Sequence, residues 1–109
     1  MSEGLTLDGL AVALRALRLL TVDLGHLPAP CVDVSTHFPN RLALSFHDDL
    51  AGFEAWRESL GITPDAVTHG TQSAGRTRVL KATADFAGAA LELTGFAEIS
   101  DPAPAGSAA

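Results

Sequence analysis

Apolar residues recur at two different periods along the chain, and the changes of period predict where helices and strands lie. In residues 7–24 and 48–60 they are three or four positions apart, which matches the turn of an α-helix. In residues 31–47 and 66–99 they alternate with polar residues, as in strands with one covered face. This order predicts an α+β fold, α-β-β-α-β-β-β, with two helices packed on one face of a mainly antiparallel five-stranded sheet.

The first helix is expected to begin after Thr6, whose hydroxyl is a suitable N-cap. Its apolar stripe, expected to cover the sheet, is formed by Leu7, Leu10, Leu14, Leu17, Thr21 and Leu24, where only the threonine is polar. Val12, Ala16 and Leu19 project on the opposite side. Either this helix is covered on two sides, or these three residues meet a second chain.

Two alternating segments between Cys31 and His47 predict a β-hairpin. A three-residue loop over residues 38–40 would place Val34 opposite Leu44 and collect the apolar side chains on one face. A slip of one residue would reverse the faces, so this register is preferred.

The second helix follows directly, with Asp48 and Asp49 as alternative N-caps and Gly61 as the residue that closes its C-terminus. Its expected core arc consists of Leu50, Phe53, Trp56 and Leu60. Glu54 and Arg57 are spaced to form a weak pair at the surface.

Three strands are expected over residues 66–72, 76–86 and 89–99. The short turn before the last strand places Phe86 opposite Ala89. The order of the strands within the sheet is not readable from the sequence.

With 109 residues and a net charge of −6, the chain is expected to form a single acidic domain over residues 6–100. Residues 1–5 read as a flexible lead-in and residues 101–109 as a flexible tail. Cys31 is the single cysteine, so neither an intrachain disulfide nor a cysteine-based zinc site can form, and the cytoplasm is favoured. No apolar run approaches the ~20 residues of a membrane span.

No sequence motif of catalysis, phosphate binding or metal binding is present, so we expect no cofactor and no enzyme activity. The triplet His47-Asp48-Asp49 has the residue types of a metal or general-base site. The end of a strand followed by helix-capping aspartates explains the same residues, and we prefer that interpretation.

The first functional hypothesis is a small non-catalytic protein-interaction module that self-associates as a homo-oligomer. It depends on apolar side chains with no evident cover within the chain. These candidate interface residues are Val12, Ala16, Leu19, Val79 and Phe96.

Two alternatives remain open. A small-ligand site or an enzyme would use the polar face of the first hairpin, which carries Asp33, His37, Arg41, Ser45 and His47. An anionic partner or nucleic acid would be bound by Arg76, Arg78 and Lys81, although the acidic balance of the chain disfavours nucleic acid. His69 and Thr71 are expected on the face opposite to these arginines.

Overall fold

A computed structural model describes residues 5–72 and 74–99 and has the predicted α+β fold. Most of the predicted lead-in and the whole predicted tail lie outside the described residues. The elements are η1 (Leu7–Leu10), α1 (Ala11–Asp23), β1 (Cys31–Ser35), β2 (Phe38–His47), α2 (Leu50–Ser59), η2 (Pro64–Ala66), β3 (Thr68–Gln72), β4 (Thr77–Phe86) and β5 (Ala89–Glu98).

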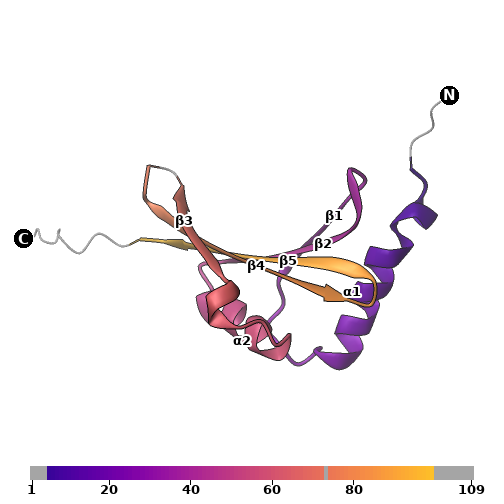
Figure 1. The fold of residues 1–109 in the computed structure, drawn as a ribbon, viewed down its shortest axis with the longest axis horizontal. Coiled ribbons are helices and arrows are strands. Elements are labelled where there is room, and N and C mark those ends of the chain that lie inside the picture. The colour runs from indigo at the N-terminus through magenta and orange to yellow at the C-terminus, as the bar shows by residue number, and fades with distance from the viewer. Residues whose placement is uncertain (1–4, 73, 100–109) are drawn as a thin grey trace, which may run out of the picture.

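The five strands form one sheet in the order β1-β2-β5-β4-β3. Neighbouring strands are antiparallel except β2 and β5, which run parallel. Both helices lie on the same side of the sheet, and the opposite face is open (Figure 1). β4 and β5 pair in the predicted register, with Phe86 opposite Ala89.

The core fills the space between the sheet and the two helices. Its fully buried large side chains are Phe53, Leu20, Leu42, Leu44, Leu91 and Leu93. Gly95 of β5 allows α2 to approach closely, because a Cβ at this position would lie 3.2 Å from side-chain atoms of Leu50 and Phe53. The expected core arc of the second helix is therefore confirmed.

The first helix is rotated relative to the prediction. α1 buries Ala13, Ala16 and Leu20, whereas Leu7 is 73% exposed and Leu14 is 37% exposed. The small side chains of Ala13 and Ala16 let the helix backbone lie close to the sheet beside Leu20. The expected stripe is thus wrong at Leu7 and Leu14, whereas Leu17 and Leu24 are partly buried against the core. The start of the helix is also different, because a 3₁₀ turn precedes α1 and the side chain of Thr6 makes no cap.

The hairpin of β1 and β2 has another register than the predicted one. Val32 is opposite Leu44, and a two-residue turn at 36–37 replaces the expected loop at 38–40. The pairing becomes irregular after Asp33. Pro39 lies in this part of β2 and has no N–H to donate to a ladder, which explains the irregularity. The shift is two residues, an even number, so the predicted faces are preserved.

Both ends of α2 are closed as the sequence suggests. Asp49 is the N-cap, and its carboxylate accepts a hydrogen bond of 3.0 Å from the Gly52 N–H. Asp48 has a different role, because its carboxylate accepts from the N–H of Glu98 at 3.2 Å and so ties the end of β2 to β5. Gly61, with φ +76°, terminates the helix in the left-handed conformation.

The predicted pair of Glu54 and Arg57 forms, with Arg57 buried and Glu54 exposed. Nη1 of Arg57 donates to the carbonyl of Ile62 at 2.6 Å, and its Nη2 donates to Glu54 at 2.8 Å. The hydrogen bonds to Arg57 hold the pKa of Glu54 below its usual value, and the same bonds raise the pKa of Arg57. The arginine thereby fixes the chain just beyond the C-terminus of α2.

Candidate functional site

One face of the sheet is covered by neither helix (Figure 1). In Figure 1 the β1–β2 hairpin and the β3–β4 hairpin rise at its two ends, on the side away from α2. Hollows of about 290, 390, 400 and 410 Å³ are distributed over this face. It is therefore an uneven surface with depressions, not a flat one.

The most structured hollow lies where β1, β2 and β5 meet, with a volume of about 290 Å³. Adjacent strands bring together residues that are far apart in sequence, because β5 pairs with β2 on the side opposite to β1. The lining residues are Asp33, Ser35, Phe38, Arg41, Ala43 and Glu92.

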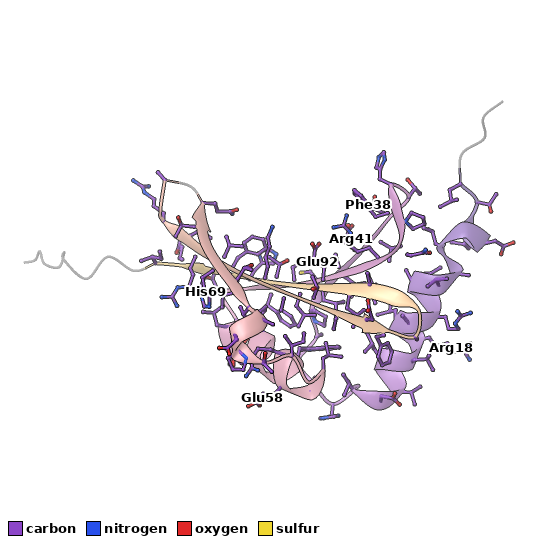
Figure 2. The ribbon with its side chains drawn as sticks, in the orientation of Figure 1. Arg18, Phe38, Arg41, Glu58, His69 and Glu92 are labelled. Carbon is purple, nitrogen blue, oxygen red and sulfur yellow. The ribbon has the colours of Figure 1, made fainter. Side chains whose placement is uncertain are left out.

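Arg41 is held between two partners inside this hollow. Its Nη1 lies 3.3 Å from both carboxylate oxygens of Glu92, and its Cζ lies 3.9 Å from the centre of the Phe38 ring. Figure 2 shows the three side chains gathered on the open side of the sheet. The ion pair and the cation–π contact restrict the arginine rotamers. Asp33 adds a further, exposed carboxylate, so the hollow has a net negative charge.

A second cluster lies further along the same face. The imidazole of His47 stacks on Phe96 with the ring centres 4.9 Å apart and the planes 11° from parallel. The Oγ of Ser45 is 3.5 Å from Nε2 of His47, at the limit of a hydrogen bond. Val79 is the cross-strand partner of Phe96 and is buried, although it faces away from the helices. This cluster can make apolar and polar contacts.

The structure divides the predicted ligand face between separate places. Asp33 and Arg41 share the first hollow, while His47 lines another with a volume of about 400 Å³. His37 is in the tight turn between β1 and β2, where its backbone N–H donates to Ser35 Oγ at 3.0 Å. Within residues 5–72 and 74–99, no group of three or more His, Cys, Asp or Glu residues could hold a metal ion.

The predicted interface residues also do not form one surface. Ala16 is fully buried under the sheet, and Val12 is half-buried at the margin of the same core. Leu19 is exposed, but Val79 and Phe96 lie on the other side of the sheet. The exposed apolar side chains of the first helical segment are instead Leu7, Leu14, Leu19 and Val22.

The basic residues near the β3–β4 hairpin point in different directions. Thr71 is opposite Arg78 in the ladder, so the two share a face, and the expectation that they lie on opposite faces is wrong. Lys81 is three positions from Arg78 and therefore faces the other side of β4. Arg76 lies in the turn before β4. The three cations do not converge on a single site.

Two residues of the first hollow were missed from the sequence. Glu92 reaches Arg41 only because β5 lies beside β2, and the sequence gives no signal for that parallel pairing. Phe38 was assigned to a loop because the following Pro39-Asn40 resembles a turn. Phe38 and Arg41 are three positions apart in β2, a spacing that places side chains on opposite faces of a regular strand, so no sequence signal connects the two.

None of the helices in the described part of the chain is long and apolar enough to cross a membrane. Comparison of the chain with protein-family models, with characterised proteins and with solved structures gives no significant match.

Proposed function

We propose that this chain is a small non-catalytic protein-interaction module that binds a protein partner on the open face of its sheet. The observation that carries this proposal is the contact of a fixed Arg41 with Phe38 on a face that has no intrachain cover. Phe38 is 55% exposed there. Arginine and aromatic residues are the types that most often dominate the energy of protein interfaces.

The physical state of Arg41 supports a binding role. An arginine that is already held by Glu92 and Phe38 loses little rotamer freedom when a partner covers it. The side chains of Arg41 and Glu92 are each about one-third exposed, so their ion pair contributes little to folding stability. The pair is therefore better explained as part of a recognition surface than as a stabilising element.

The distribution of the hollows favours a polypeptide over a small molecule. They extend from the β1–β2 hairpin to the β3 edge, and each is open to solvent. A small-molecule pocket usually encloses most of its ligand, whereas a protein partner covers a broad and shallow surface. Polar and apolar side chains alternate across this face, as in the rim and centre of many interfaces.

A small ligand in the first hollow is the second candidate. Asp33, Ser35 and Arg41 present polar groups around a volume of about 290 Å³, close to the lower limit for ligand pockets. Their side chains offer both donors and acceptors.

Affinity capture from the native host extract, with the purified chain as bait, tests the proposal. Phe38→Ala should reduce retention of the partner at least tenfold, which corresponds to about 1.4 kcal/mol. Ile99→Ala is the matched control, because Ile99 is an exposed apolar residue after the end of β5. Equal retention by the wild type and both variants would contradict a partner site around Phe38.

A further inference from the structure

We propose that the partner on the open face is a second copy of this chain, whose α1 docks with Arg18 beside Asp33. This inference rests on the proposed function, since it names the partner of the same face. The contact joins two different surfaces of one chain, the outer face of a helix and the open face of a sheet.

The outer face of α1 has an unusual combination of groups for a surface helix. Leu14, Arg18 and Val22 are spaced by four residues and so follow one ridge of the helix. Leu14 is 37% exposed and Val22 is 74% exposed, and Arg15 lies beside the same ridge. In Figure 2 Arg18 points away from the sheet into solvent. Arginine is one of the residue types that are enriched among the energetically dominant residues of interfaces.

The charge of α1 is opposite to that of the surface it would meet. α1 contains two arginines and one acidic residue, Asp23 at its C-terminal end, and so has a net positive charge in a chain whose net charge is −6. The first hollow contains the carboxylates of Asp33 and Glu92 against the single cation of Arg41. Because Glu92 is occupied by Arg41, the carboxylate available to a basic side chain of the partner is that of Asp33.

The other cations of the chain are less suitable for this role. Arg41 and Arg57 already have carboxylate partners within their own chain. Arg78 and Lys81 face opposite sides of β4, and Arg76 lies in the turn before this strand. Arg15 and Arg18 share α1 with the exposed aliphatic side chains of Leu14 and Val22, which can cover the exposed ring of Phe38.

The shapes of the two surfaces are also compatible. A helix of 13 residues is a rod about 20 Å long. The open face lies between two hairpins that rise at its ends, and it is depressed between them (Figure 1). The helix and the open face lie on different sides of the sheet, so the contact is head-to-tail, with the α1 of one copy on the open face of the next. A dimer with one such contact is the first assembly expected.

Charge reversal with mixing tests this arrangement. Asp33→Arg changes only the sheet side of the contact, and Arg18→Asp changes only the helix side; both residues are exposed, so both variants should fold. Each variant alone faces like charges in the contact of its homodimer. In a one-to-one mixture, the contact between the two variants again joins opposite charges.

Analytical ultracentrifugation from micromolar to submillimolar concentration provides the readout. The wild type should dimerise, each single variant should show a dissociation constant at least tenfold higher, and the mixture should recover most of that loss. Asp65→Arg and Arg76→Asp are matched controls, because they make the same charge changes at exposed positions outside both surfaces. They should dimerise like the wild type.

A monomeric wild type over this range would overturn the inference, and so would a mixture that associates no better than the separate variants. The proposed function fails in a different way. A monomeric wild type that still retains another protein through Phe38 would refute the second copy and leave the interaction module intact. Retention independent of Phe38 would refute the module.

Discussion

Trp56 offers the sharpest test of how α2, β2 and the connector before β1 are held together. The indole is only 5% exposed, its ring centre is 6.4 Å from that of Phe46, and its Nε1 donates to the carbonyl of Pro28 at 2.7 Å. The side chain therefore joins α2, β2 and the connector. Its truncation should loosen all three elements together.

Trp56→Ala should lower the free energy of unfolding by ~3–5 kcal/mol, the range for loss of a buried aromatic side chain. Trp56→Phe keeps a ring and loses the hydrogen bond, so its cost should be about 1–2 kcal/mol. A domain of this size has a total stability of roughly 5–15 kcal/mol, which makes the first variant marginal. An apolar hollow of about 250 Å³ already borders the indole, so truncation would enlarge a space that is present in the wild type.

Urea denaturation followed by far-UV circular dichroism measures both variants, because removal of the single tryptophan also removes its fluorescence. Leu7→Ala is a suitable control, since a side chain that is 73% exposed should change stability by less than ~0.5 kcal/mol. A loss below ~1 kcal/mol for Trp56→Ala would refute the reasoning, since it would show that the indole does not hold these elements together.

Three further predictions concern glycines and one ion pair. Gly95→Ala should lower the free energy of unfolding by ~1–3 kcal/mol, because α2 leaves no space for a Cβ at this position. Gly70→Ala is the control and should be nearly neutral, since nothing lies within 4 Å of its Cβ. Equal losses of stability in thermal denaturation would contradict the close helix–sheet contact. Gly61→Ala should cost about 1–2 kcal/mol through its positive φ alone, and an unchanged melting temperature would show that the C-cap can relax. The pKa of Glu54 is lowered from 4.5 by its hydrogen bonds to Arg57, so its stabilising effect is present above pH 4.5 and is lost as the pH falls through the lower pKa of the folded state. Stability measured against pH should therefore fall less on acidification for Glu54→Gln than for the wild type, and identical slopes would show that the pair is not formed in solution.

The parts of the fold that local chemistry determines were predictable from the sequence. The turn between β4 and β5 consists of two residues with positive φ, Ala87 and Gly88, and its length fixes the register of the hairpin. The ends of α2 follow from an aspartate and a glycine at capping positions. In each case the residues that decide the structure are adjacent in the chain.

The rest depends on contacts between distant segments. The parallel pairing of β2 with β5 brings Glu92 to Arg41, and nothing near either residue indicates this. The rotation of α1 about its axis depends on how closely the helix can approach the sheet. Ala16 is therefore part of the core, although its apolar surface is small. In the first hairpin, Pro39 suggested a turn but lies within a strand. The candidate site was thus recognised only in part.

The position of β5 has a consequence for how the chain folds. It is the last strand in sequence, yet it pairs with both β2 and β4 and so joins the β1–β2 hairpin to the β3–β4 hairpin. During synthesis, one edge of β2 stays without a partner until residues 89–98 have left the ribosome. Pairing strands so distant in sequence carries a high loop-closure entropy, which slows folding. Before β5 docks, the apolar side chains of β2 remain available for intermolecular contacts, so this interval is when aggregation would compete with folding.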